Sequence, residues 1–295
     1  MKKLFVMFMK LISQIMKNEF GGSWTENKIT ILEKYVRAYL VIMNKYNFHL
    51  TYFDGFAGSG DIKIGTEKSH KTIEGAGKRI VQITEPRPFD IYYLVEKDPK
   101  KRQNLDTDLR KASNDPNIFT VTDDCNLALA RFSRFISESK SRRGLVFLDP
   151  FGMNLDWTAL ESLKGVDVDL WILCPTGVGA NRLLKKDLDI SEAWWDRLER
   201  FFGITREQLT GSIYQDSTNT NLFGEVVTST TKATKANTKL FNIYRSKINE
   251  LFKFTSEPFI MVNKNNSTMF HFFCASNYEA AINLANTIMR KAIRE

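Results

Sequence analysis

The chain has 295 residues, of which 43% are hydrophobic and 26% charged, and its formal net charge is +8. This composition is typical of a folded globular protein and excludes disordered and fibrous classes. The three cysteines and three histidines are scattered without a CxxC pair, so neither a disulfide framework nor a zinc site is predicted. We expect the cysteines to be small buried residues, and we expect no metal.

The first 22 residues form a basic, apolar extension. The run MKKLFVMFMKLISQIMK begins like a signal peptide, but Lys10 interrupts it, no small-residue cleavage site follows, and it is too short to span a bilayer. Its apolar side chains fall on one helical face, which predicts an amphipathic helix docked on the body or on a partner; a membrane-surface role is the alternative. We therefore expect an extension over 1–22, no membrane span and a cytoplasmic protein.

The basic excess is localised near the start of the chain. Residues 1–50 hold eight Lys or Arg against three Glu, a net +5. Such a patch suits a phosphate backbone, and nucleic acid is the expected partner, although a solvated face is the alternative.

From residue 26 onward the chain alternates helical and strand patterns. Apolar residues at three- and four-residue spacing predict a helix over 26–46, with Thr25 as its N-cap. Short apolar runs then alternate with helical segments, which predicts a parallel sheet with helices on both faces. These runs are 49–53, 91–95, 117–121, 145–148 and 169–173.

The end of the chain changes character. A helical segment over 238–252 precedes apolar runs at 259–262 and 268–275, which predict an antiparallel hairpin. Five β/α units, a helix and a closing hairpin are the topology of a class I methyltransferase (Rossmann-like) fold with a seven-stranded sheet. We predict one such α/β domain over 23–295.

About sixty residues are inserted into this domain, at about 175–236. Residues 181–203 are rich in tryptophan and predict a helical lid, whereas residues 215–239 are rich in Ser, Thr and Asn and predict a mobile loop.

A glycine turn follows the first predicted strand. The sequence YFDGFAGSG places Asp54 at the strand end and Gly55, Phe56, Gly58 and Gly60 after it. Glycine permits close approach of a ligand and positive φ, yet the spacing is not that of a dinucleotide-binding loop. GAGKR at 75–79 also lacks the Walker pattern, so a phosphate loop is not predicted.

Acidic residues end the next two strands. Glu96 in VEKD can accept both hydroxyls of a ribose, and Asp124 in DDCN, which precedes Cys125, can accept an adenine amine. In an open α/β sheet ligands lie outside the carboxyl ends of the strands. Each acid alone is more often merely solvated, but with Asp54 they predict a site for S-adenosylmethionine.

The fourth predicted strand ends in FLDPFG. Together with DGFAGSG, VEKD, DDCN, Asn181–Arg182 and WTENK near the start, this motif order resembles the three-Cys-motif partner protein (TcmP) family over most of residues 24–295. The resemblance implies a class I methyltransferase fold and a protein partner that carries the three cysteines of the family name, so this chain's own three are coincidental.

DPFG is also similar to the fourth motif of amino-group methyltransferases that act on nucleic-acid bases, and to the DPFG of tRNA guanine N-dimethyltransferases. In that chemistry the Asp149 carboxylate and the Pro150 carbonyl would accept the hydrogens of an exocyclic amine while Phe151 stacks on the base. The second proline of the common motif is missing, and a purely structural Asp-Pro turn is the alternative.

The leading prediction is therefore an S-adenosylmethionine-dependent methyltransferase that N-methylates an exocyclic amine of a DNA or RNA base. A non-catalytic, cofactor-binding scaffold of another enzyme is one alternative. A methyltransferase acting on a small molecule or a protein is the other.

Overall fold

The computed structural model divides the chain into two compact units, which are described separately below. The first unit comprises Met1–Asp124, Ser141–Phe147 and Asn283–Glu295, and the second comprises Cys125–Lys140 and Leu148–Ile282. The residues described are 23–66, 69–181, 184, 190–220, 226–232 and 235–294. The predicted extension 1–22 lies outside them, and the predicted domain limits stay a prediction.

Four parallel strands form the sheet of the first unit. They are β1 (His49–Asp54), β4 (Ile91–Val95), β5 (Ile118–Val121) and β6 (Arg142–Leu148), in the order β6-β1-β4-β5. Apart from His49, every residue of β1 is buried, as expected for a strand in the middle of a parallel sheet. Four of the predicted strands are thus confirmed.

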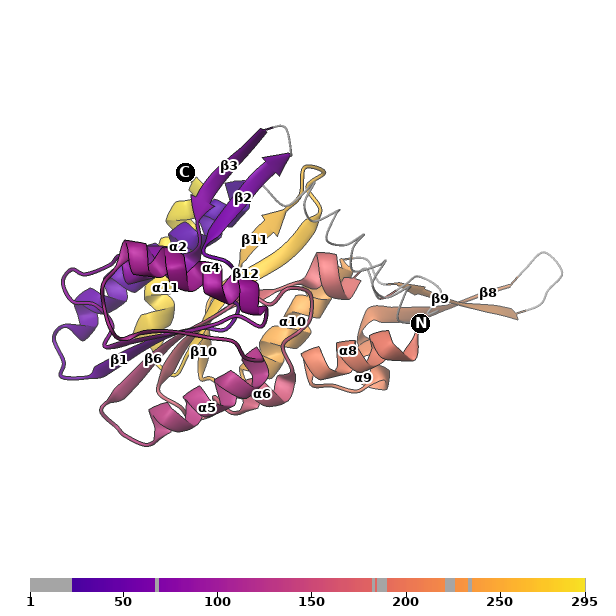
Figure 1. Cartoon of the computed structure of the whole chain (residues 1–295). Coiled ribbons are helices and arrows are strands. Elements are labelled where there is room, and N and C mark those ends of the chain that lie inside the picture. Colours follow the sequence, from indigo (N-terminus) through magenta and orange to yellow (C-terminus); the bar gives the residue numbers. More distant parts are fainter. Residues whose placement is uncertain are drawn as a thin grey trace. The chain divides into compact units, whose positions relative to one another are not determined.

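Three helices belong to the same unit: α2 (Ser23–Met43), α3 (Ala76–Val81) and α4 (Pro99–Ala112) (Figure 1). Most of the apolar stripe that predicted the first of them is buried, and Leu32, Val36 and Leu40 have no exposed surface. Helix α3 packs against both α2 and α4.

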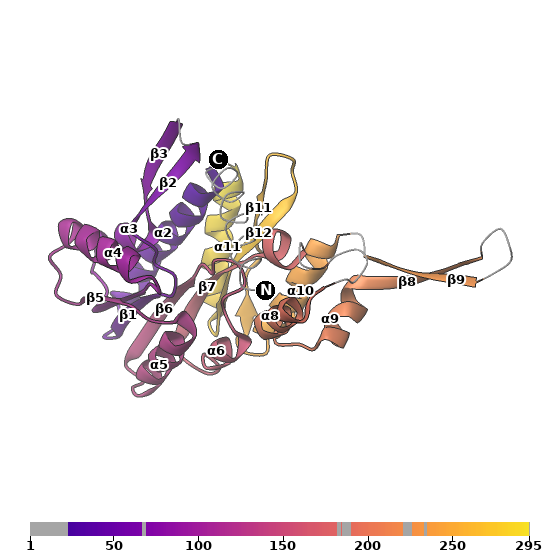
Figure 2. The ribbon, with the colours of Figure 1, turned by 45° about the vertical axis from the view of Figure 1, so that its right-hand side comes forward.

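A β-hairpin that the sequence did not predict follows the glycine turn. Strands β2 (Asp61–Thr66) and β3 (Ser69–Glu74) pair antiparallel and extend away from β1 and α4 (Figures 1 and 2). At the base of the hairpin, the Gly75 amide donates to the Gly60 carbonyl oxygen at 2.7 Å. The two ends of the hairpin are therefore joined, and α3 begins directly after the second strand.

Antiparallel strands form the sheet of the second unit. Strand β12 (Thr268–Ser276) pairs with β7 (Val168–Cys174), β11 (Phe259–Val262) and the two-residue β10 (Phe254–Thr255). All seven residues of β7 are buried. The predicted closing hairpin is confirmed as β11–β12, and the predicted α/β fold is confirmed, with parallel strands in the first unit and antiparallel strands in the second.

The remaining helices lie mainly in the second unit. They are α5 (Cys125–Ser137), α6 (Trp157–Glu161), the π-helix η1 (Thr176–Ala180), α8 (Glu192–Phe202), α9 (Arg206–Ile213), α10 (Ala236–Ile248) and α11 (Glu279–Arg294), which belongs to the first unit from Asn283 onward. The inserted helix α8 packs on α10, where Phe201 stacks on Tyr244 with ring centroids 4.8 Å apart.

The mobile loop predicted over 215–239 is wrong for much of its length. Strands β8 (Tyr214–Thr220) and β9 (Val226–Lys232) pair antiparallel and extend away from α8 and α9 (Figures 1 and 2). The physical reason is that these segments are rich in threonine and valine, whose β-branched side chains favour strands. The polar composition of residues 215–239 therefore did not predict their conformation.

Candidate functional site

The turn after β1 is held by the backbones of its neighbours. The Gly55 amide donates to the Phe147 carbonyl oxygen at 3.0 Å, and the Ala57 amide donates to the Val95 carbonyl oxygen at 2.9 Å. Asp54, only 1% exposed, accepts the Phe56 amide on Oδ1 at 3.1 Å. The carboxylate that the sequence placed at the strand end therefore fixes the turn itself.

Two glycines of this turn have backbone conformations that favour glycine. Gly58 has φ +69° and Gly60 has φ +94°. A Cβ atom on Gly60 would also lie 3.2 Å from Asp108 Oδ2 of α4. Replacing either residue would strain the turn, as expected if its shape serves a close approach to a ligand.

Glu96 follows β4 and has one anchored oxygen. Its Oε1 accepts the Asp98 amide at 2.8 Å, and its Oε2 accepts no hydrogen bond from the described part of the chain. Asp98 in turn caps α4 by accepting the amides of Lys100 and Lys101, and these bonds lower the pKa of Asp98. Asp98 belongs to the motif VEKD but was not among the predicted site residues. It supports Glu96 through its amide and caps α4 through its side chain.

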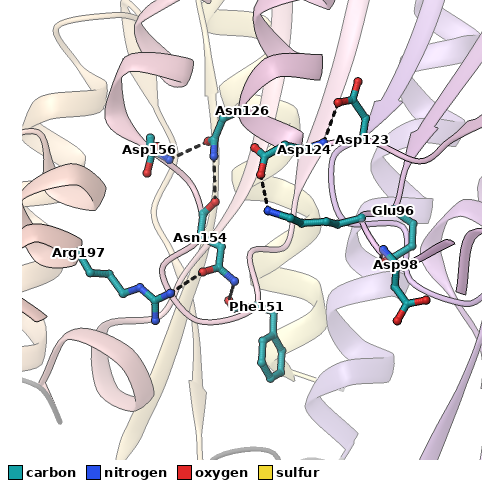
Figure 3. A network of polar contacts seen from close by, with 10 residues as sticks. Glu96, Asp98, Asp123, Asp124, Asn126, Phe151, Asn154, Asp156 and Arg197 are labelled. Carbon is teal, nitrogen blue, oxygen red and sulfur yellow. Dashed lines mark hydrogen bonds and ion pairs between the residues drawn. The ribbon is translucent and has the colours of Figure 1, made fainter. Parts of the chain in front are cut away.

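Asp124 follows β5 and forms an ion pair across the same edge of the sheet. Lys97 Nζ lies 2.8 Å from Asp124 Oδ2 (Figure 3). The lysine side chain is 79% exposed, so water screens the pair and little free energy is needed to break it. The Asp124 amide donates to Asp123 Oδ1 at 2.8 Å.

The first unit thus gathers most of the predicted cofactor residues. Asp54, Glu96 and Asp124 end or follow three adjacent parallel strands, and the Glu96 amide donates to the Val121 carbonyl oxygen of β5 at 3.1 Å. The glycine-turn residues Gly55, Phe56, Gly58 and Gly60 lie beside Asp54 in sequence. Cys125 is different, because it begins α5 in the second unit and is buried, with 6% exposed.

GAGKR has a structural role in the first unit. Lys78 pairs with Asp61 at 3.1 Å and with Glu74 at 3.3 Å, which ties α3 to the hairpin base. Arg79 lies 3.6 Å from Glu33 of α2. Both cations are therefore already paired with carboxylates.

The predicted acceptor residues follow β6, in the second unit. Asp149 is half-buried, Pro150 is buried and Phe151 is 45% exposed. Gly152 then turns the chain with φ +74°. An exposed phenylalanine directly after a buried strand is a surface that can stack on a planar ligand.

A side-chain network that the sequence did not reveal supports this loop (Figure 3). Asn154 Nδ2 donates to the Phe151 carbonyl oxygen at 2.7 Å, and Arg197 Nη2 donates to Asn154 Oδ1 at 3.0 Å. Asn126 Nδ2 donates to the Asn154 carbonyl oxygen at 3.3 Å, and Asn126 Oδ1 accepts the Asp156 amide at 2.8 Å. Asn126 lies in the motif DDCN and could have been singled out, but no local signal identifies Arg197.

The described residues contain neither a helix that could span a membrane nor a cluster of metal ligands. None of the helices within them is long and apolar enough to cross a bilayer. Within the same residues no three His, Cys, Asp or Glu side chains are grouped as metal ligands would be. All three cysteines are buried and unbridged, as expected.

No protein-family model and no curated protein matches the chain. Among solved structures it is similar to protein LPL1258 of Legionella pneumophila, at 12% identity and TM-score 0.41, over 88% of this chain and 98% of that one. It is also similar to Trm1 of Pyrococcus horikoshii in complex with S-adenosyl-L-methionine, at 10% identity and TM-score 0.39, over 91% and 75% of the two chains. The plantazolicin methyltransferase BamL, bound to SAH, matches at 9% identity and TM-score 0.37, over 91% of each chain. All three TM-scores lie below 0.5, so the fold assignment rests on the strand pairing described above.

Proposed function

We propose that the protein is an S-adenosylmethionine-dependent methyltransferase whose first unit holds the cofactor. The observation that carries this proposal is the row of acids at the ends of β1, β4 and β5, beside a turn that needs glycine. In the proposal, Glu96 accepts the ribose hydroxyls through its unused oxygen and Asp124 accepts the adenine amine after releasing Lys97.

The charge at this edge of the first unit favours a sulfonium cofactor over a nucleotide with phosphates. Asp54, Glu96, Asp98, Asp123 and Asp124 are carboxylates, and they outnumber the cations Lys97, Lys100 and Lys101. Such an edge repels a pyrophosphate and tolerates a ligand with a positive sulfur and no phosphate. The cations of GAGKR do not change this balance, because carboxylates already neutralise them.

The loop after β6 is proposed to bind the methyl acceptor, an exocyclic amine of a nucleic-acid base. The Asp149 carboxylate and the Pro150 carbonyl accept the amine hydrogens, which directs the nitrogen lone pair toward the electrophile. Phe151 stacks on the base. When bound, S-adenosylmethionine supplies the electrophilic methyl group.

The same proposal includes membership of the three-Cys-motif partner protein family. It also includes a protein partner that carries three cysteines, and a cytoplasmic location. The motif order given above supports the family and its protein partner, and the basic charge near the start of the chain supports the nucleic-acid acceptor. A non-catalytic cofactor-binding scaffold would share the cofactor residues but would transfer no methyl group.

Two measurements test the proposal. First, S-adenosylmethionine or S-adenosylhomocysteine should bind in calorimetry and raise the melting temperature, because a ligand of the native state stabilises it. No heat and no melting shift at millimolar ligand would contradict the cofactor site.

Second, the purified chain should transfer labelled methyl groups to total nucleic acid, and nuclease treatment should abolish the signal. Binding without transfer to nucleic acid, protein or small molecules would favour the scaffold. Transfer that survives nuclease treatment would instead indicate another acceptor.

A further inference from the structure

The loop that presents Phe151 is held by a side chain from the inserted segment. Asn154 bonds the Phe151 carbonyl oxygen at 2.7 Å, and Arg197 of α8 bonds Asn154 at 3.0 Å. These two bonds run in series from α8 to the backbone of Phe151, while the Phe151 ring points away from the Asn154 amide (Figure 3). The ring is 45% exposed and therefore accessible to a ligand.

Arg197 determines how the Asn154 amide is oriented. A guanidinium group only donates hydrogen bonds, so it must face the amide oxygen. The amide NH₂ is then turned toward the Phe151 carbonyl oxygen, which only accepts. Asn126 fixes the backbone at Asn154 and Asp156 independently, so the bond to Phe151 is the part that Arg197 controls.

The guanidinium is itself held in place. It lies over the Trp194 ring, with its carbon atom 5.5 Å from the ring centroid. Burial and the nearby Arg200 lower the pKa of Arg197, whereas Asp156 raises it. Arginine nevertheless stays protonated at neutral pH, so the donor is present under ordinary conditions.

We propose that Arg197 is a positioning residue for the methyl acceptor. Through Asn154 it fixes the backbone of Phe151 and hence the exposed ring on which the acceptor base stacks. The inference rests on the proposed function, in which Phe151 is the stacking residue. It gives helix α8 a role in acceptor binding without any contact between Arg197 and the acceptor.

Hydrogen exchange tests the hold on the loop without requiring methyl transfer. In Arg197→Gln, peptides covering residues 149–156 should exchange about tenfold faster than in the wild type, since a charge-assisted bond is lost. Arg200→Gln is the matched control, because it removes the same charge from the same helix and its pair with Asp156 is long, at 4.0 Å. Unchanged exchange in Arg197→Gln would overturn the inference.

Steady-state kinetics with S-adenosylmethionine and single-stranded nucleic acid test the role in acceptor binding. Arg197→Gln should raise the KM for nucleic acid about tenfold and leave the KM for the cofactor within about twofold, and Arg197→Lys should recover part of the loss. An equal rise in Arg200→Gln would show a general charge effect and overturn the inference.

Asn154 offers the sharpest variant. Asn154→Asp keeps an acceptor for Arg197 but cannot donate to the Phe151 carbonyl, so it should resemble Asn154→Ala and Arg197→Gln. Wild-type kinetics in Asn154→Asp would overturn the inference. If hydrogen exchange of residues 149–156 increases in Arg197→Gln as expected while the wild type methylates nothing, the proposed function fails. The stabilisation of the loop by Arg197 is still shown in that case.

Discussion

The loops at the strand ends of the first unit and the loop after β6 in the second are held in different ways. The side chains of Glu96 and Asp54 each accept an amide two residues away, so short local segments orient these carboxylates, while backbone bonds to the neighbouring strands hold the segments themselves. The loop after β6 depends on Asn126 and Arg197, which are 28 and 43 residues from Asn154. The first arrangement suits a site defined by local motifs, and the second suits a surface that other parts of the unit can adjust.

The largest expected effect tests whether the loop after β6 serves chemistry rather than cofactor binding. Asp149→Ala should lower methyl transfer by about a hundredfold or more, because a positioned acceptor for the amine hydrogens is lost. Affinity for S-adenosylmethionine should stay within a few fold, as measured by calorimetry. Full activity, or joint loss of cofactor binding and folding, would show that DPFG is a structural turn.

The next prediction concerns a buried polar pair of the second unit. Thr176 Oγ1 lies 2.8 Å from His271 Nδ1, the His271 ring stacks on Phe241, and burial lowers the pKa of His271 to about 4. The unfolded chain binds this proton at an ordinary pKa of about 6.5. The free energy of unfolding should therefore fall as pH drops from about 6.5 to about 4, by about 3 kcal/mol.

Urea unfolding at several pH values measures this loss. His271→Phe should flatten the pH dependence in that window, and His49→Gln, on an exposed residue at the start of β1, should not. An unchanged pH profile in His271→Phe would assign the acid sensitivity to other groups.

A smaller effect is expected at the first unit's strand ends. Glu96→Gln removes the charge of the proposed ribose acceptor and should weaken S-adenosylmethionine binding about tenfold, because bonds to charged acceptors are the stronger ones. The exposed Glu85→Gln serves as control. Equal affinities in the two variants would show that Glu96 does not bind the cofactor, and the contrast between the two units would then not hold.

The smallest effect is expected at the ion pair between Lys97 and Asp124. Its lysine side chain is 79% exposed, so Lys97→Gln should change the free energy of unfolding by less than about 0.5 kcal/mol. Cofactor affinity should rise by no more than about threefold, because Asp124 no longer has to release Lys97. A large loss of affinity would instead make Lys97 part of the site.

The main strands were predicted because each is a short apolar run; all seven residues of β7 are buried, whereas Phe119 of β5 is 46% exposed. The β2–β3 hairpin was not predicted because its sequence is mostly polar and lacks an apolar run. The candidate cofactor residues were predicted because most of them lie at or shortly after a strand end, and their role in binding stays a prediction. Arg197 was not predicted, because its bond to Asn154 joins residues that are 43 positions apart.

The closed base of the β2–β3 hairpin makes it a natural site for grafting. Because the Gly75 amide bonds the Gly60 carbonyl oxygen, the chain on either side of residues 61–74 is joined as though the hairpin were absent. A Cβ atom on Gly75 would lie 2.1 Å from that oxygen, so the junction requires glycine there. A reporter peptide or a longer recognition arm could therefore replace the hairpin while β1 and α3 keep their places.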